Sequence, residues 1–209
     1  MEWTERADAA VARYRGGETR ELDQRQLTQL GNAAWAAGLS LLMAGQRDEA
    51  AEWLRRSAER YRESWEGAPP DSWGRPIAAM KALLLAGDDA SDAARWALDA
   101  GAAEAESPIG RYAGTLAQLV LGDNVSARIL GESLRDRDDF PQDVADALVE
   151  LAGTDRVDYA IALEHIVDSF ERRTDFLEDV PVADTVLVLQ VLAAKRNLPV
   201  DLPPSPLLP

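Results

Sequence analysis

The stretch Leu41-Leu42-Met43-Ala44-Gly45, followed by Asp48-Glu49-Ala50-Ala51-Glu52-Trp53-Leu54, decides the fold of this 209-residue chain. An apolar pattern ends at a glycine, acidic residues follow, and a second amphipathic pattern begins. Glycine readily takes the left-handed conformation that ends a helix, and carboxylates favour the first turn of the next one. The stretch therefore predicts two helices joined by a tight turn.

The same pattern returns three times, at Gly87, Gly122 and Gly153, with spacings of 42, 35 and 31 residues. One helical hairpin cannot bury its apolar face alone, so neighbouring hairpins must stack. The 36 alanines and the scarcity of β-branched runs also favour helices. The sequence predicts an all-α chain, a curved α-solenoid of about four to five antiparallel hairpins.

The first hairpin resembles a tetratricopeptide repeat. It has Gly38, Gly45, Ala50 and Leu54 at the spacings with which that family packs its two helices. The resemblance implies a tetratricopeptide-like stack that binds a protein or peptide, with no catalytic role and no cofactor.

We expect residues 1–209 to form a single domain. Residues 1–21 are expected to form an N-terminal helix and linker, and residues 22–197 the hairpins, the last helix being 184–196. Residues 198–209 hold five prolines, which fix φ and remove backbone donors, so an extended Pro-rich cap is predicted there. Its leucines are expected to pack along the last hairpin.

Charge and composition exclude several classes of site. The chain has 37 acidic and 22 basic residues, a net charge of −15, and only two lysines. Such a surface repels phosphate, so no nucleic-acid partner is expected. With no cysteine and one histidine, thiolate and histidine-rich metal sites are excluded. The acidity is typical of a salt-adapted cytoplasm, although GC-rich coding alone would account for the arginines.

The first residues lack the basic start and apolar run of an export signal, and no run of about 18 apolar residues occurs. A cytoplasmic protein without a membrane partner is expected.

Three polar residues recur at similar positions. Asn32, Arg75 and Arg111 each follow a glycine, at spacings of 43 and 36 residues, and we expect them near the starts of the first helices, facing a concave groove. Tetratricopeptide proteins that grip peptide C-termini use a comparable row, so the resemblance implies a carboxylate clamp. Simple solvation of the arginines is the alternative.

Trp65 and Trp73 bracket the loop 66–72. Aromatic residues near loops can anchor a partner, so both are candidate binding residues. The alternative is that they pack the loop onto its own helices.

Catalysis would have to rest on His165 with Glu164 and Asp168, whereas the alternative is a solvated histidine among ordinary surface acids. Nucleotide-binding motifs are absent from the sequence. No catalytic, metal or cofactor residue is therefore assigned, and a His165-based enzyme stays the third hypothesis.

The C-terminal segment Leu192-Ala193-Ala194-Lys195-Arg196-Asn197, continuing into Leu198-Pro199-Val200-Asp201, is similar to the end of polymorphic-toxin immunity proteins of immunity family 49. That resemblance implies binding and neutralising of a cognate toxin. The favoured hypothesis is a protein- or peptide-binding repeat module, with the immunity protein as second.

Overall fold

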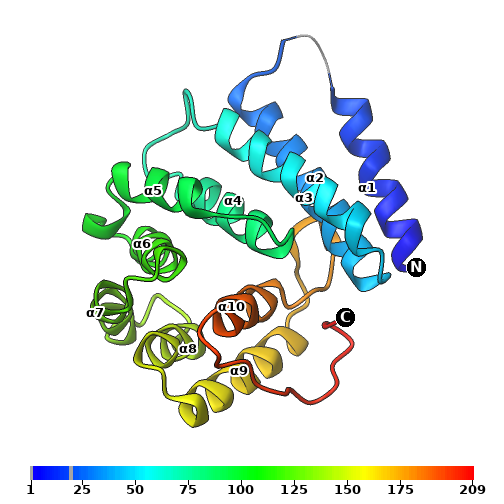
Figure 1. Cartoon of the computed structure of the whole chain (residues 1–209). Coiled ribbons are helices and arrows are strands. Elements are labelled where there is room, and N and C mark those ends of the chain that lie inside the picture. The colour runs from blue at the N-terminus through cyan, green and yellow to red at the C-terminus, as the bar shows by residue number, and fades with distance from the viewer. Residues whose placement is uncertain (1, 19–20) are drawn as a thin grey trace.

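The computed structural model describes residues 2–18 and 21–209, and this part of the chain is all-helical, without a strand (Figure 1). It contains ten α-helices and two short 3₁₀ helices, η1 and η2. Their bounds are α1 Trp3–Gly17, α2 Gln24–Met43, α3 Arg47–Glu63, α4 Gly74–Leu85, α5 Ser91–Asp99, η1 Ala102–Glu104, α6 Pro108–Leu121, α7 Asn124–Arg135, α8 Gln142–Gly153, α9 Arg156–Glu171, η2 Leu177–Asp179 and α10 Asp184–Ala194. The predicted all-α class is confirmed.

The turns after α2, α4, α6 and α8 share one backbone hydrogen bond. In each, an N–H donates to the carbonyl oxygen five residues earlier, and the donor–acceptor pairs are Gln46–Leu41 (2.9 Å), Asp88–Leu83 (2.9 Å), Asp123–Gln118 (3.0 Å) and Asp155–Glu150 (3.2 Å). This bond is typical of a helix end with a left-handed residue before the donor. Gly45, Gly87 and Gly122 take that conformation, with φ of 75°, 79° and 80°, as predicted.

The prediction is wrong at the fourth turn. Gly153 remains the last residue of α8, and Thr154 takes the left-handed conformation with φ of 63°. Gly153 instead faces α7, because a Cβ added there would lie 3.4 Å from Arg128 Nη1. The helix end is set by the backbone hydrogen bond, and a β-branched residue adopts the strained conformation that this bond requires.

The small-to-large packing predicted for the first hairpin is confirmed. A Cβ added at Gly38 on α2 would come within 2.6 Å of Leu54 Cγ on α3, and 3.4 Å from the carbonyl oxygen of Ala50. The absence of a side chain at Gly38 therefore lets the two helices approach closely.

Helices α1 to α9 pack mainly on their neighbours in chain order, and the row curves round on itself (Figure 1). Helix α10 lies in the hollow of this curve and contacts α4, α8 and α9. It is apolar on almost every side, as expected of a helix surrounded by protein. The chain's own last helix therefore occupies the inner side of the row, where the sequence predicts an open groove.

Polar contacts fix both ends of α10. At its start, Lys81 Nζ on α4 donates to Asp184 Oδ2 and Thr185 Oγ1, both at 2.9 Å. Just beyond its end, Arg196 donates to Asn124 Oδ1 at 2.9 Å, and it also donates to a carbonyl oxygen at the end of α6. Helix α10 is thus bonded to the row on two sides.

The segment 198–209, all of which is described, has no helix or strand and runs back over α10 and α9. The side chain of Gln190 exchanges hydrogen bonds with the backbone of Val200, at 2.5 and 3.3 Å. The carbonyl oxygen of Leu207 accepts from Ala183 N at 3.0 Å, and Ser205 Oγ donates to Glu171 Oε1 at 2.7 Å. Side-chain and backbone bonds thus hold this segment against the last two helices.

Candidate functional site

A groove with an apolar floor and a charged rim runs between α3 and α5 over α4. Its volume is about 470 Å³, within the size range of protein ligand sites. We call it the α3–α5 groove, and it is lined by Arg55, Ala58, Glu59, Arg62, Ala79, Leu83, Asp88, Asp92, Ala93 and Trp96.

Small residues create the space. Helix α3 buries an apolar stripe against α2 and α4, and Ala58 lies at the edge of that stripe. Ala79 on α4 and Ala93 on α5 face the same space. Three methyl groups at one crossing leave a hollow where larger side chains would meet.

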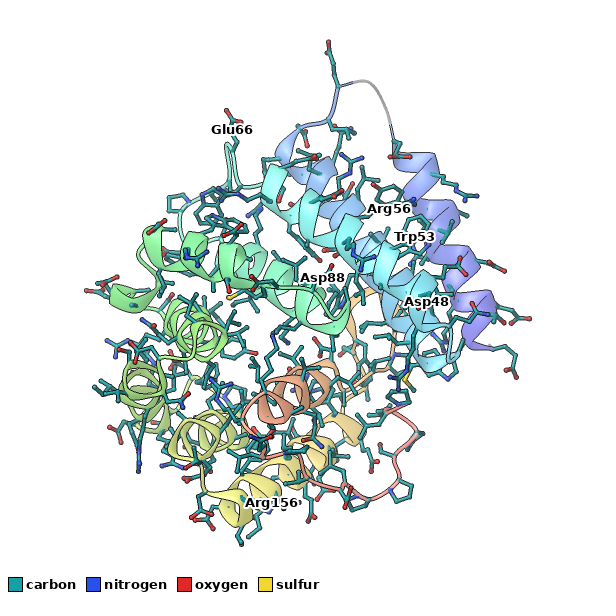
Figure 2. The ribbon with its side chains drawn as sticks, in the orientation of Figure 1. Asp48, Trp53, Arg56, Glu66, Asp88 and Arg156 are labelled. Carbon is teal, nitrogen blue, oxygen red and sulfur yellow. The ribbon has the colours of Figure 1, made fainter. Side chains whose placement is uncertain are left out.

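The rim carries a two-pronged ion pair. Arg55 Nε lies 2.6 Å from Asp88 Oδ2, and Arg55 Nη2 lies 3.0 Å from Asp88 Oδ1. Figure 2 shows Asp88 beside α3. The hydrogen bonds to Arg55 lower the pKa of the Asp88 carboxyl, so this rim carboxylate stays ionised at neutral pH. The pair holds the end of α4 against α3.

Trp96 forms one wall of the groove, and its ring is held on two sides. The Arg62 guanidinium carbon lies 4.4 Å from the centre of the Trp96 ring, a cation–π contact. Trp65 meets the same ring edge-on, with centroids 5.4 Å apart. Tryptophan and arginine are enriched among the residues that dominate binding energy at protein interfaces.

Both tryptophans predicted to bind a partner belong to this cluster. Trp73 is only 6% exposed, and its Nε1 donates to Asp71 Oδ1 at 3.1 Å. Trp65 is half-buried, with its ring 6.2 Å from that of Trp73 and in contact with Trp96. The two tryptophan rings pack inward, whereas the loop between them stays largely exposed at residues 66–67 and 69–71, and Glu66 projects from it (Figure 2). Trp65 supports the groove wall through its contact with Trp96.

The structure does not join Asn32, Arg75 and Arg111 into one row of free groups. Asn32 Oδ1 accepts from the Tyr61 hydroxyl at 2.7 Å, and Arg111 Nε donates to the Ala105 carbonyl oxygen at 3.1 Å. Among the described residues, no hydrogen bond links one member of the row to another.

Arg75 is the most engaged of the three. It donates to Ser64 Oγ at 2.9 Å, to Thr28 Oγ1 at 3.2 Å and to the side-chain oxygen of Gln24. Burial lowers the pKa of Arg75. Its guanidinium joins the start of α2 to the end of α3 and the start of α4.

The three glycines before this row occupy different structural positions. Gly74 begins α4 and Gly110 lies near the start of α6, but Gly31 lies well inside α2, so its expected place near a helix start is wrong. A Cβ at Gly31 would lie 3.1 Å from the Tyr61 ring, whereas one at Gly74 would meet nothing within 4 Å. Similar spacing in the sequence therefore does not give the three glycines the same position in their helices.

His165 lies exposed on α9, as do Glu164 and Asp168. Across residues 2–18 and 21–209, no group of three or more His, Asp or Glu side chains is placed to hold a metal ion. No helix in the described ranges is long and apolar enough to cross a membrane.

Comparison with protein-family models, curated proteins and solved structures finds no match to this chain.

Sequence reasoning missed Trp96 and Arg62 as site residues. Trp96 fits the apolar face of an amphipathic helix, and Arg62 fits a group of arginines on α3. No signal in the sequence could have found them, because the space beside Ala58, Ala79 and Ala93 exists only when all three helices are in place.

Proposed function

We propose that the chain is a non-catalytic, tetratricopeptide-like repeat protein of about four to five hairpins that binds another protein or peptide in a salt-adapted cytoplasm. Binding takes place in the α3–α5 groove, which receives an apolar side chain of the partner. The observation that carries the proposal is the groove itself, where Trp96, Leu83 and three alanines lie below a rim of ionised side chains.

The groove has the anatomy of a small interface. An apolar centre releases water when a partner side chain enters, and a charged rim sets the orientation of the partner. The contacts with Arg62 and Trp65 fix the Trp96 ring before binding, so little conformational freedom is lost when a partner docks.

The test begins with peptides selected on the purified protein from a random library displayed on phage. A selected peptide is then measured against the wild type, against Ala93→Met, which fills the groove, and against Ala12→Met, which adds the same side chain at an exposed position on α1. We expect an apolar anchor residue in the peptide, a dissociation constant raised about tenfold or more by Ala93→Met, and no change with Ala12→Met. Equal binding to wild type and Ala93→Met contradicts the proposal.

A second candidate function is neutralisation of a basic toxin. The net charge of −15 is the observation that favours it, since complementary charge speeds association and excludes acidic partners. Co-expression with the product of an adjacent toxin-like reading frame tests it. Rescue of growth supports this function, and unchanged toxicity contradicts it.

A further inference from the structure

Four branched aliphatic side chains stand exposed on α7 and α9. Val125 and Ile129 on α7 are 73% and 66% exposed, and Val157 and Ile161 on α9 are 69% and 48% exposed. We call these four residues the aliphatic patch. Single exposed aliphatics are ordinary, whereas several on helices that pack against a common neighbour make a candidate contact surface, and α7 and α9 both pack against α8.

The exposed aliphatic pair on α9 repeats the pair on α7 at the interval of the helical repeat. Val157 and Ile161 follow Val125 and Ile129 by 32 residues, and the N-cap residues Asp123 and Asp155 are separated by the same interval. On each helix the two aliphatics are four residues apart, one turn, so they form a short ridge. The two ridges occupy the same register on their helices.

The first half of the chain has no such ridge on its first outer helix. Counting from the N-cap of α3, the corresponding positions are Asp48 and Glu52, both exposed. Figure 2 labels Asp48 near the start of α3 and Arg156 at the start of α9, next to Val157. Among the described residues, Ile109 on α6 and Leu177 in η2 are also exposed, at 46% and 53%, but neither belongs to such a ridge. The paired ridges of α7 and α9 therefore do not follow from the repeat itself.

A second cavity lies beside the α7 ridge. It has a volume of about 400 Å³ and is lined by Asn124, Val125, Arg128, Ile129, Glu132, Ala152 and Gly153. The last two residues end α8, and α9 begins three residues after Gly153. Their small size leaves the hollow open next to the exposed ridge, and ridges of helical side chains fit hollows of this kind.

The charges close to the patch in the sequence are mainly negative, and Arg196, which donates to Asn124 beside Val125, is half-buried. Arg128 and Arg156 are the two cations within three residues of a patch member, and Arg128 lies 3.8 Å from Glu132. The acids within the same range are Asp123, Glu132, Asp155, Asp158 and Glu164. A second copy of this chain, also at −15, would meet like charge across the patch, whereas a basic partner would meet its complement.

We infer that the aliphatic patch docks an amphipathic helix of a basic protein, with aliphatic residues against the two ridges and Lys or Arg on its flanks. This inference rests on the proposed protein-binding function and adds a second contact surface, separate from the α3–α5 groove, together with the chemistry of the partner.

The probe is a fluorescein-labelled helical peptide of about five turns, with leucine on one face and lysine on the other. A matched peptide carries glutamate for lysine. Binding is followed by fluorescence anisotropy at physiological ionic strength, and hydrogen exchange locates the protected helices. We expect the lysine peptide to bind and protect α7 and α9, and the glutamate peptide not to bind.

The decisive variant is V125T/I129T/V157T/I161T, which keeps the branched shape and the net charge while removing the apolar surface. Circular dichroism and thermal unfolding establish that it folds. The control is D48T/E52T, which places threonine at the corresponding positions of α3 and lowers the negative charge. We expect the patch variant to raise the dissociation constant about tenfold or more and the control to change it less than about twofold.

Two results would overturn the inference. One is equal affinity of the lysine peptide for wild type and patch variant, which means that binding follows net charge alone. The other is a wild type that forms a dimer and a patch variant that is a monomer, which assigns the surface to a second copy of the chain. Because Ala93→Met leaves the patch intact, it should keep lysine-peptide binding. Failure of the α3–α5 groove proposal is thus distinguishable from failure of the aliphatic-patch inference.

Discussion

Lys81 Nζ and Asp184 Oδ2 lie 2.9 Å apart, although 103 positions separate the two residues in the chain. The pair is largely buried and joins α4 to the first turn of α10. It connects the middle of the row to the helix that lies in the hollow.

Removing one partner of this pair should destabilise the fold strongly. Lys81→Met leaves the Asp184 carboxylate without its cation, and we expect a loss of about 3 kcal/mol in the free energy of unfolding, measured with urea. Adding Asp184→Asn removes the orphaned charge and should restore at least about 1 kcal/mol. Additive losses in the double variant would show that the two side chains do not interact.

A methyl group at Gly38 should disrupt the first hairpin. Because the added Cβ would come 2.6 Å from Leu54 Cγ, Gly38→Ala must push α2 and α3 apart, and we expect a loss of about 1–3 kcal/mol. The matched control is Gly16→Ala, where a Cβ on α1 meets nothing within 4 Å. That change should be neutral or stabilising by up to about 1 kcal/mol. Equal thermal shifts for the two variants would contradict this prediction.

Replacing the left-handed Thr154 by glycine should stabilise the fold. Thr154→Gly removes the clash of a β-branched side chain at φ of 63°. We expect the free energy of unfolding, measured by thermal unfolding, to rise by about 1 kcal/mol. Thr174 is also exposed but has no positive φ, so Thr174→Gly should be neutral or destabilising. A lower melting temperature for Thr154→Gly would count against strain at the α8–α9 turn.

Stability should decline in alkaline solution. Burial raises the pKa of Tyr61, Tyr112 and Tyr159, so the unfolded chain releases these protons at lower pH than the folded chain. Burial opposes the charge of Lys81, but Asp184 and Tyr112 more than offset it, so the pKa of Lys81 is also raised. The stabilisation from all four groups is present at neutral pH and is lost as the pH rises above about 10.

Urea unfolding at a series of pH values, together with tyrosinate absorbance, measures this effect. Tyr112→Phe removes one of the groups. It should reduce the slope of the free energy of unfolding against pH, in alkaline solution, by up to about 1.4 kcal/mol per pH unit. A free energy of unfolding that is constant to pH 11 would contradict the raised pKa values.

Salt should stabilise the fold. At −15 the carboxylates repel one another, and raising KCl from about 0.1 M to about 2 M shortens the screening distance to a few ångströms. We expect the melting temperature to rise with KCl, and to rise less in a variant with exposed acids such as Asp138, Asp158 and Glu164 changed to amides. A melting temperature that is independent of salt in both proteins would remove the physical basis for salt adaptation.

The parts of the fold that depend on local chemistry could be predicted from sequence. Gly45, Gly87 and Gly122 end helices because a left-handed residue is needed there, and this requirement is readable from a single chain. Gly38 and Leu54 could also be paired, because the resemblance of the first hairpin to a tetratricopeptide repeat implies that a small and a large residue meet there.

Features that depend on contacts between distant segments could not be predicted. The position of α10 follows from contacts such as Lys81 with Asp184, and no spacing rule relates α4 to residue 184. For the same reason Arg75, which looks like a free cation in the sequence, is taken up by Gln24, Thr28 and Ser64. The α3–α5 groove combines residues of three helices, and its alanines resemble every other helical alanine until the helices are assembled.

The position of α10 also determines how the molecule unfolds. A linear row of hairpins has contacts only between neighbours and can open from either end, one unit at a time. Helix α10 touches α4, α8 and α9 together, so losing any one of these helices exposes apolar surface on α10 and weakens its hold on the other two. We therefore expect α4, α8, α9 and α10 to unfold together rather than one hairpin at a time. During synthesis, the inner faces of α4 and α8 stay uncovered until residues 184–194 have emerged.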